Sequence, residues 1–323
     1  MLELITLDPE FHRLFNLLSA HQVMLADELR VARFARAILE TVKEGDVVVD
    51  LGTGTGILAF LAIKAGAKRV HAIERNDIIH LAQEVANANG WGDRIIFHKA
   101  DALQVTLPER ADVVISETIG HMGLAEDFVE NMVHARRSFL KEGGVLMPCS
   151  VSVYVAPVEC QEAHNQVSFW EQRPWGIDFS PLASRCRKQV YIRHFPETDI
   201  LALPAQLAFF DLYCAQSSNV AKTVAFEIEA GTEIHGYCGW FQARLSADIV
   251  LETSPFSSPT HWEQTYFPIN SPLHIKTPTK ISVAFRFDGS VPEWKWETLL
   301  NPSNNSRGNR GSLLTASSTK QTP

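Results

Sequence analysis

The chain has 323 residues and a mass of 36.0 kDa, about two domain lengths, which excludes a single small module. Hydrophobic residues make up 46% of the sequence and charged residues 20%, a balance typical of globular proteins, so disorder over most of the chain is excluded. The formal net charge of −8 argues against a general nucleic-acid-binding protein and leaves cationic partners open.

The first half of the chain alternates helical and strand patterns. Residues 8–43 have apolar side chains three or four positions apart with charges between them, which predicts a helical segment. Residues 47–51 are a short β-branched run, typical of a buried parallel strand, and a glycine-rich loop follows. Further strands are predicted at residues 69–73, 94–98, 113–116 and 145–148, and helices at residues 57–65, 78–89 and 126–140. This alternation predicts an α/β domain with a doubly wound, Rossmann-like parallel sheet.

After about residue 150 the sequence changes to short β-rich segments separated by Pro, Gly and Ser, which predicts an antiparallel β-domain, a barrel or a sandwich. An aromatic-rich excursion at about residues 163–187 has two interpretations: a surface buried on a partner or a second subunit, or part of the domain's own core. The tail has almost no apolar residue and is predicted to be disordered. The predicted units are therefore a helical segment, the α/β domain, the β-domain and the tail, at residues 1–43, 44–149, 150–302 and 303–323.

Further features of the sequence bear on where the protein resides. No apolar run reaches the roughly 20 residues of a membrane helix, because the longest, at residues 57–67, contains Lys64. The N-terminus has neither a basic start nor a small-residue cleavage site, so no signal peptide is expected. The five cysteines form no C-x-x-C pair, which argues against a zinc ribbon and a disulfide framework. We therefore expect a cytoplasmic protein that has no metal site and binds neither membranes nor nucleic acid directly.

The strongest local motif lies between the first strand and its helix, where Asp50 is followed by Gly52, Thr53, Gly54 and Gly56. Glycines let the backbone turn tightly and approach a ligand, and the helix N-terminus behind them favours negative groups. The spacing is G-x-G-x-G after an acidic residue, which favours S-adenosylmethionine (SAM) over NAD. The alternative is a coincidental glycine turn.

Acidic side chains follow the next two strands. Glu74 closes the strand at residues 69–73, where a carboxylate can accept hydrogen bonds from both hydroxyls of a ribose. Asp101 could accept from the adenine amino group while the backbone of Ala102 meets the ring nitrogen. A solvated strand-end carboxylate is the alternative for Asp101. Together with the glycine loop, these residues predict a SAM-binding site.

Two glutamates flank the loop after the fourth strand. Glu117 ends that strand and should point into the crevice beyond the carboxyl ends of the sheet, and glycines in the loop can fold Glu126 back beside it. Two carboxylates suit a guanidinium, which keeps its proton up to a pH of about 12 and offers a planar fork of donors. The alternative is that Glu126 stabilises a helix N-terminus and Glu117 is an incidental strand end.

Two separate loops of the sequence resemble those of a known protein family. Residues 11–300 resemble the protein arginine N-methyltransferase family: the segment from Glu117 to Glu126 resembles its double-glutamate loop, and Thr260-His261-Trp262-Glu263-Gln264-Thr265 resembles its Thr-His-Trp loop. The resemblance implies a SAM-binding domain followed by a β-barrel, with a dimerisation arm at about residues 163–187. It also implies that the protein works as a ring-like homodimer.

The resemblance further implies roles for single residues. Glu117 and Glu126 would hold the substrate guanidinium, and Arg30 would bind the SAM carboxylate. Asp27 and His261 would form a pair between the domains that helps to close the site. The remaining implied contacts are Met24 beside the methyl group and, at the substrate, Phe15, His21, Phe128 and Trp262. From the residues alone His261 is ambiguous, because an isolated histidine is usually structural and its tryptophan neighbour could be core.

The sequence departs from the family pattern in two places. Phe11 and Phe15 stand where the family has tyrosines, so any hydrogen bond from those hydroxyls is lost. Phe128 stands two residues after the second glutamate, where many dimethylating members have methionine, and a ring there would narrow the space around the acceptor nitrogen. We therefore expect one methyl transfer per guanidinium as the main outcome.

The expected function is SAM-dependent N-methylation of an arginine guanidinium in a protein or peptide, by direct in-line transfer that relies on positioning and electrostatics. One alternative keeps the chemistry but acts on free L-arginine or another small guanidino compound, since the tyrosines are missing and no recognition domain precedes the helices. Another is an inactive SAM-fold subunit that supports an active partner. The loop spacing disfavours an NAD oxidoreductase.

Overall fold

We describe a computed structural model of the chain, which covers residues 9–290, 292–299 and 316–317 and the side chains from residue 18 onward except those of 316–317. The predicted helical segment is two helices, α1 (Pro9–Ala26) and α2 (Glu28–Thr41). The break falls at Asp27, whose carboxylate accepts from the backbone N–H of Arg30 at 2.9 Å and caps α2. The cap at Asp27 therefore divides the helical segment into two helices, although the spacing of its apolar residues continues across the break. Among the described helices, none is long and apolar enough to cross a membrane.

The α/β domain contains the predicted parallel sheet, with strand order β3-β2-β1-β4-β5. Its strands are β1 (Val47–Leu51), β2 (Arg69–Glu74), β3 (Ile95–Lys99), β4 (Ala111–Ser116) and β5 (Leu140–Met147), and its helices are α3 (Ile57–Ala65), α4 (Ile78–Ala88) and α5 (Phe128–Ser138). All five residues of β1 are buried, as expected for a strand covered on both faces. The strand order reverses between β1 and β4, which is where ligands bind in doubly wound sheets.

The pattern predicted a helix that starts at residue 126, but helix α5 begins at Phe128. Glu126 and Asp127 have left-handed backbones with φ of 59° and 57°, which excludes them from the helix. This conformation is uncommon for residues other than glycine and depends on contacts that local periodicity does not report. Glu126 therefore precedes the first helical turn, and the interpretation of it as a helix N-terminal residue is wrong.

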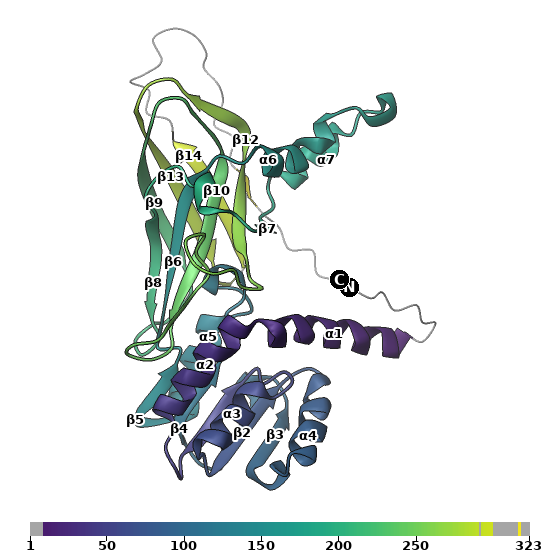
Figure 1. Ribbon diagram of the computed structural model, residues 1–323, viewed down its shortest axis with the longest axis vertical. Coiled ribbons are helices and arrows are strands. Elements are labelled where there is room, and N and C mark those ends of the chain that lie inside the picture. The colour runs from purple at the N-terminus through teal and green to yellow at the C-terminus, as the bar shows by residue number, and fades with distance from the viewer. Residues whose placement is uncertain (1–8, 291, 300–315, 318–323) are drawn as a thin grey trace.

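The second half of the chain forms antiparallel sheets in a barrel domain (Figure 1). One sheet has the order β7-β12-β10-β6-β8, with β11 paired to β10, and the other has the order β15-β14-β13-β9. The strands are β6 (Ser150–Val158), β7 (Tyr191–Arg193), β8 (Ala205–Asp211), β9 (Val220–Ile228), β10 (Thr232–Arg244), β11 (Val250–Glu252), β12 (Gln264–Ile275), β13 (Thr279–Asp288), β14 (Glu293–Leu299) and β15 (Ala316–Ser317). Most of the tail predicted to be disordered lies outside the described residues. For Ala316–Ser317 that prediction is wrong, because they pair with the outer edge of β14, which has unpaired backbone groups to offer.

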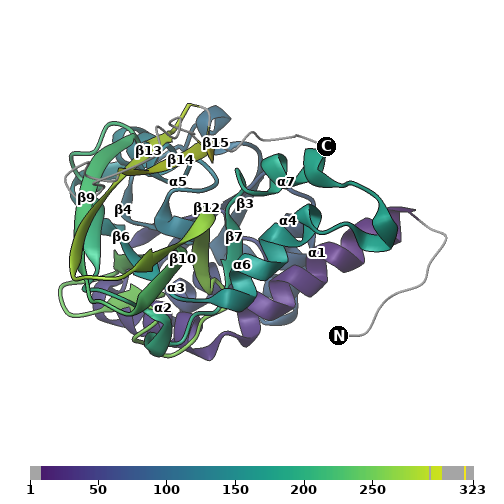
Figure 2. The same ribbon diagram turned by 90° about the horizontal axis from the view of Figure 1, so that it is seen from above.

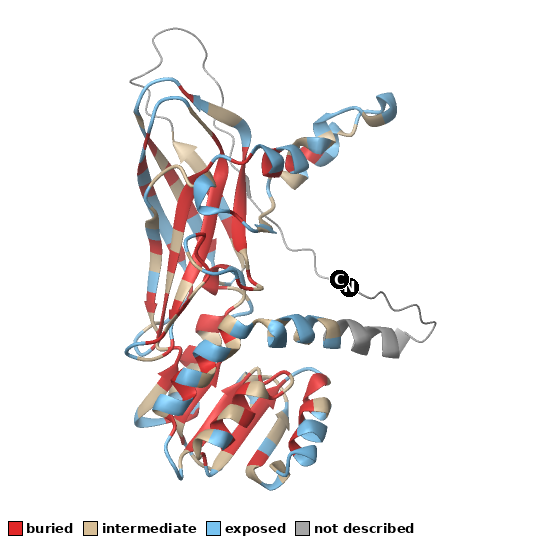
Figure 3. Ribbon diagram, viewed as in Figure 1, coloured by how far each residue is buried: buried red, intermediate tan, exposed pale blue. Residues whose placement is uncertain are grey.

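The aromatic-rich excursion contains α6 (Gln161–Ser168) and α7 (Ser180–Cys186) and projects sideways from the barrel (Figures 1 and 2). Ala163 and Val167 of α6 are buried against the barrel, in a cluster with Phe195 and Trp240. The far end of the excursion is exposed in Figure 3, and Trp175, which lies between α6 and α7 in the sequence, is 97% exposed. The excursion is therefore only in part a piece of the barrel's own core.

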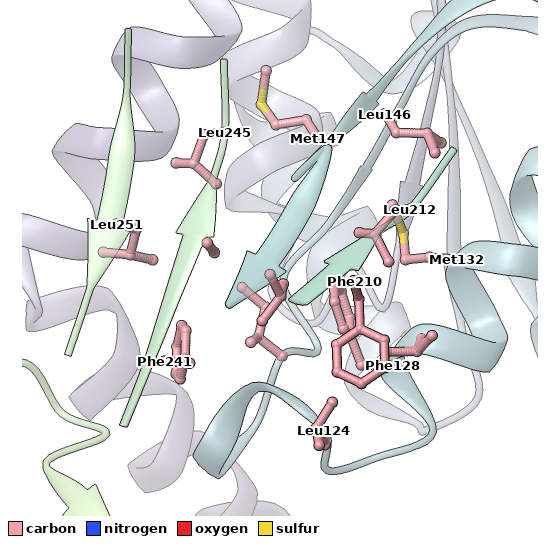
Figure 4. Close-up of a cluster of buried hydrophobic side chains, with 14 of the residues drawn as sticks. Leu124, Phe128, Met132, Leu146, Met147, Phe210, Leu212, Phe241, Leu245 and Leu251 are labelled. Atoms are coloured by element: carbon pink, nitrogen blue, oxygen red, sulfur yellow. The ribbon is translucent and has the colours of Figure 1, made fainter. Parts of the chain in front are cut away.

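The α/β domain and the barrel share one hydrophobic core. Figure 4 shows Phe128 and Met132 of α5 beside Phe210 of β8, with Phe241 of β10 nearby, and all four belong to one continuous cluster of buried residues. Leu124, in the loop that carries the two glutamates, belongs to the same cluster. The segment between β4 and α5 is thus held by both domains.

Two histidines on adjacent strands predict an acid-sensitive fold. Nδ1 of the fully buried His71 lies 3.0 Å from Nε2 of His98, and burial lowers the pKa of both. The folded chain keeps them neutral while the unfolded chain protonates them below a pH of about 6.5, so their contribution to stability is present above that pH and is lost as the pH falls.

We expect the free energy of unfolding to fall below pH 6.5 with a slope of up to about 1.4 kcal/mol per pH unit for each histidine. Urea unfolding between pH 7.5 and 5.0 measures it. The double variant His71→Leu/His98→Leu should flatten the slope, while the exposed control His80→Gln should leave it unchanged. An unchanged slope in the double variant would contradict this assignment.

Candidate active site

A cavity of about 550 Å³ lies at the reversal point of the parallel sheet. That volume falls within the usual range of small-molecule sites, about 300–1,000 Å³. The loop after β1, the end of β4, helices α1 and α2 and the barrel loop at His261 all contribute to its wall. Most of the predicted site residues line it: His21, Met24, Arg30, Gly52, Thr53, Gly54, Glu74, Glu117, Glu126, His261 and Trp262.

A second cavity of about 110 Å³ adjoins the first and shares Gly52, Glu74 and Glu126 with it. Asp101 and Ala102 line this smaller cavity, so the structure groups the predicted adenine contacts together. One carboxylate oxygen of Asp101, Oδ1, also accepts from the backbone N–H of Leu103 at 2.9 Å. Asp101 therefore shapes its own turn as well as the cavity wall.

The glycines of the loop after β1 are required by close packing. A Cβ on Gly52 would lie 2.2 Å from Cγ2 of Thr118, and one on Gly54 would lie 2.6 Å from Cε1 of His21. Both glycines also have positive φ, of 74° and 54°. His21 thus lies directly over the loop, and helix α1 covers this part of the site (Figure 1).

Asp50 and Gly56, both predicted to bind the cofactor, lie behind the loop and do not line either cavity. Asp50 is fully buried, and its Oδ2 accepts from the Thr53 hydroxyl at 2.6 Å and from the Ala59 N–H at 3.0 Å. Burial raises the pKa of Asp50 to about 6. Oδ1 of Asp50 has no partner among the described residues. A Cβ on Gly56 would meet the Phe60 ring at 2.5 Å, so these two residues shape the loop from below.

Glu74 meets the requirement for a group that accepts from ribose hydroxyls. Its side chain lies at the end of β2, accepts from the Asn76 N–H at 2.8 Å and from the Gly54 N–H at 3.3 Å, and lines both cavities. The donor and acceptor set therefore fits a nucleoside ligand such as SAM.

The structure brings Glu117 and Glu126 to one cavity, as predicted. The left-handed backbone at Glu126 turns the chain back after the loop, and the Asn131 amide donates to the Glu126 carbonyl at 3.2 Å. Burial raises the pKa of Glu126, Arg75 opposes that rise, and Glu74 and Asp127 add to it.

Glu117 is not free in this structure, because Arg30 binds it. Nε of Arg30 donates to Oε2 of Glu117 at 2.6 Å, and Nη2 donates to the same oxygen. Nη1 of Arg30 donates to the Met24 carbonyl at 2.9 Å. Burial raises the pKa of Glu117 to about 7, the Arg30 charge opposes the rise, and Glu126 adds to it. Two residues predicted to hold different ligands are thus bound to each other.

The predicted contact between Asp27 and His261 is present. Oδ2 of Asp27 accepts from the His261 N–H at 2.9 Å and lies 2.8 Å from Nδ1 of the ring. Burial alone would raise the pKa of Asp27, but the hydrogen bonds from Arg30 and His261 bring it below its usual value. The same carboxylate therefore caps α2 and ties it to the barrel.

Sequence reasoning missed His121, which lines the main cavity. Its Nδ1 lies 3.1 Å from the carbonyl oxygen of Trp262, which can only accept, so Nδ1 carries the proton. Burial lowers the pKa of His121. The one available signal was its position between the two glutamates of the loop.

One predicted substrate contact, Phe128, does not line the cavity, and the side chain of another, Phe15, lies outside the described residues. Phe128 is fully buried in the shared core and lines neither cavity, so the prediction that its ring narrows the acceptor space is wrong. The barrel side chain Phe210 lies beside the ring, an apolar neighbour that the sequence does not reveal (Figure 4). Phe15 belongs to α1, and its side chain lies outside the described part of the structure.

Comparison with known proteins places the chain among methyltransferases. The family profile described as the arginine methyltransferase oligomerization subdomain matches residues 150–294, and the profile of the ribosomal protein L11 methyltransferase matches residues 35–150. Protein arginine N-methyltransferase 6 of Danio rerio is 30% identical over 276 residues, covering 81% of this chain and 79% of that protein. Its counterpart in Xenopus laevis is 28% identical over 289 residues, covering 85% of each chain.

Solved structures share the fold. The Trypanosoma brucei PRMT1 enzyme–prozyme heterotetrameric complex with AdoHcy matches with a TM-score of 0.81 at 23% identity, covering 93% of this chain and 97% of that one. Protein arginine methyltransferase 10 of Arabidopsis thaliana matches with a TM-score of 0.76 at 22% identity, covering 92% and 96%. The predicted arrangement of a Rossmann-like domain followed by a barrel is thereby confirmed.

Proposed function

The chain belongs to the protein arginine N-methyltransferase family, and from this premise we infer that it methylates arginine side chains of proteins with SAM as the methyl donor. The observation that carries this function is the convergence of Glu117 and Glu126 on one cavity that also contains the glycine loop. Two carboxylates there match the planar charge of a guanidinium. SAM, when bound, supplies a methyl group attached to a positively charged sulfur.

The residues of this chain act by binding and orienting. Glu117 and Glu126 hold the guanidinium, and Met24, which also lines the cavity, lies beside the methyl group of the cofactor. The Asp27–His261 pair closes one side of the cavity and limits the entry of water. A site that holds both reactants in this way accelerates the methyl transfer through positioning and fixed charge, and no strong base is needed.

A methyl-transfer assay with labelled SAM tests the function. It offers an Arg/Gly-rich peptide and free arginine side by side, with mass spectrometry on the products. We expect transfer to the peptide. The alternatives, a free-arginine methyltransferase and an inactive partner subunit, are not favoured by the names of the relatives. Transfer to free arginine alone would revive the first alternative, and SAM binding without any transfer would revive the second.

We further propose that the main product is monomethylarginine. The support is the identity of residue 128, a phenylalanine where many dimethylating members of the family have methionine. Because its ring is buried away from the cavity, Phe128 would act by fixing the position of Glu126, two residues before it. The same mass spectra measure the product, and mostly dimethylarginine would contradict the proposal. The expected cytoplasmic location also stays a prediction.

We also propose that the chain forms a homodimer through the arm of α6 and α7. Phe169, Trp175 and Ile177 on this arm are 43%, 97% and 58% exposed, a cluster of apolar side chains typical of an interaction surface. Light scattering should give the mass of two chains, and Trp175→Glu/Ile177→Glu should give one. The control Leu203→Glu changes a side chain that is 89% exposed elsewhere and should leave the dimer intact. A single-chain mass for the unchanged protein would contradict the proposal.

A further inference from the structure

The main cavity contains a histidine that the proposed function does not use. His121 lines the cavity and belongs to the loop that connects Glu117 with Glu126. Of the other histidines in the cavity wall, His21 lies over the glycine loop and His261 comes from the barrel. His121 is therefore the histidine whose backbone is continuous with both glutamates that hold the substrate guanidinium.

The barrel holds the loop at His121 in one position. Met122 has a left-handed backbone, with φ of 60°, which is uncommon for a residue other than glycine and depends on the surrounding contacts. Strand β10 makes room for the Met122 side chain at Gly239, where a Cβ would lie 2.5 Å from Sδ of Met122. At the next residue of the loop, a Cβ on Gly123 would lie 2.7 Å from Cγ1 of Val151 in β6. The loop is thus packed closely against two strands, and the position of His121 is fixed with it.

The hydrogen bond of His121 also determines which ring nitrogen can act on a ligand. Nδ1 donates to the carbonyl oxygen of Trp262 at 3.1 Å, so in the neutral ring the other nitrogen, Nε2, carries a lone pair. Burial lowers the pKa of His121, so the ring is mostly neutral at pH 7 and above. Within the part of the chain that the structure describes, no group binds Nε2. This nitrogen is therefore an acceptor for a ligand in the cavity.

A substrate guanidinium has N–H groups to spare for such an acceptor. It offers five N–H donors. Oε2 of Glu117 already accepts from Nε and Nη2 of Arg30, which leaves Oε1 of Glu117 and the two carboxylate oxygens of Glu126. A further acceptor on the same loop therefore has an N–H of the substrate to bind.

Methyl transfer requires that the attacking nitrogen of the guanidinium loses a proton. The electron pair of this nitrogen forms the new bond to the methyl carbon, and the bond between that carbon and the sulfur breaks with its electrons on the sulfur. We propose that His121 is a catalytic residue whose Nε2 takes the proton that the attacking nitrogen gives up. The methylated guanidinium keeps its single positive charge, and the imidazolium passes the proton to water.

This inference rests on the proposed function and agrees with a reaction that needs no strong base. The proton becomes acidic only as the bond between nitrogen and carbon forms. A weak base such as imidazole is then sufficient, provided that it already lies within hydrogen-bonding distance of the nitrogen. The packing of the loop against the barrel supplies that placement.

His121→Asn tests the role of the basic nitrogen. Asparagine places its amide nitrogen where Nδ1 of histidine lies, so it can keep the hydrogen bond to Trp262, but it has no basic nitrogen. We expect kcat for an Arg/Gly-rich peptide at pH 8 to fall by about 100-fold, the lower end of the usual effect of general base catalysis. The KM of the peptide should stay within about 3-fold, because the lost interaction belongs to the transition state. The control His80→Asn changes an exposed histidine on α4 and should keep full turnover.

Rescue by small bases separates proton transfer from a structural role. His121→Ala leaves a space the size of an imidazole ring, and added imidazole should raise its kcat by at least about 10-fold. The compound 1,2,4-triazole has nearly the same size but is a much weaker base, so it should restore little activity. The control His80→Ala should respond to neither compound.

Full turnover in His121→Asn would overturn the inference, and so would equal rescue of His121→Ala by the two compounds or rescue by neither. If His121→Ala does not fold, the loss of kcat at an unchanged KM in His121→Asn decides the question. Failure of the proposed function is distinguishable, because the unchanged protein would then leave the peptide unmethylated.

Discussion

Replacing Glu117 by Gln is expected to lower kcat for an arginine peptide by about 100- to 1,000-fold, the usual cost of removing one preorganised charge or donor from an active site. Glutamine keeps the shape and one acceptor oxygen but has no charge to hold the guanidinium. It also leaves Arg30 buried without its countercharge, since both Nε and Nη2 of Arg30 bind the lost carboxylate.

Steady-state kinetics with a peptide measure this effect, and calorimetry with S-adenosylhomocysteine checks that the cofactor still binds. The matched control Glu84→Gln changes an exposed glutamate on α4 and should keep full turnover. Near-normal turnover in Glu117→Gln would refute the role of Glu117 as a clamp.

The same residue predicts a pH dependence. Burial raises the pKa of Glu117 to about 7, so in the free enzyme a proton competes for this carboxylate at lower pH. Glu117 must be charged to hold the substrate guanidinium, so kcat/KM should fall as the pH decreases through 7.

Replacing Asp27 by Ala is expected to have the second large effect, a loss of about 3–7 kcal/mol in the free energy of unfolding. Its carboxylate caps α2 through Arg30 and accepts from both the backbone and the side chain of His261. Alanine removes the cap, worth about 1 kcal/mol, and leaves two donors of His261 unpaired, at about 1–3 kcal/mol each.

Urea unfolding measures this loss. Asp27→Asn retains an acceptor oxygen and should lose about half as much, while the exposed Asp93→Ala should be nearly neutral. If Asp27→Ala were as stable as the unchanged protein, the contact with His261 would have no role in joining α2 to the barrel.

The sequence was a good guide where structure depends on local pattern. The continuous β-branched run of β1 and the start and end of α3 follow from residue type, because a strand buried on both faces needs no alternation and glycines bound the helix. Glu117 lies in the predicted cavity because it follows β4, whose position in the sheet is set by topology, and the loop after it brings Glu126 to the same cavity.

The resemblance implied one contact between distant segments, that of Asp27 with His261, but the contact of Arg30 with Glu117 could not be predicted. Arg30 and Glu117 are 87 positions apart in the sequence. The resemblance assigned each of them to a different ligand, and nothing in the sequence indicated that these two buried, oppositely charged side chains bind each other. The position of Phe128 was missed for a similar reason. The left-handed turn at Glu126 and Asp127 changes the direction of the chain just before the ring, and the apolar residues that receive it come from the barrel.

The core that runs from α5 into β8 and β10 has a consequence for modularity. A chimera that combines one half of this chain with the other half of a relative would divide the shared hydrophobic core. This core contains Phe128 on one side of the domain boundary and Phe210 and Phe241 on the other. A chimera would inherit two faces shaped for different neighbours, with cavities or overlaps next to the loop that carries Glu126. The boundary near residue 150 therefore separates two sheets but not two hydrophobic cores. The two domains have to be exchanged or engineered together with the core residues that join them.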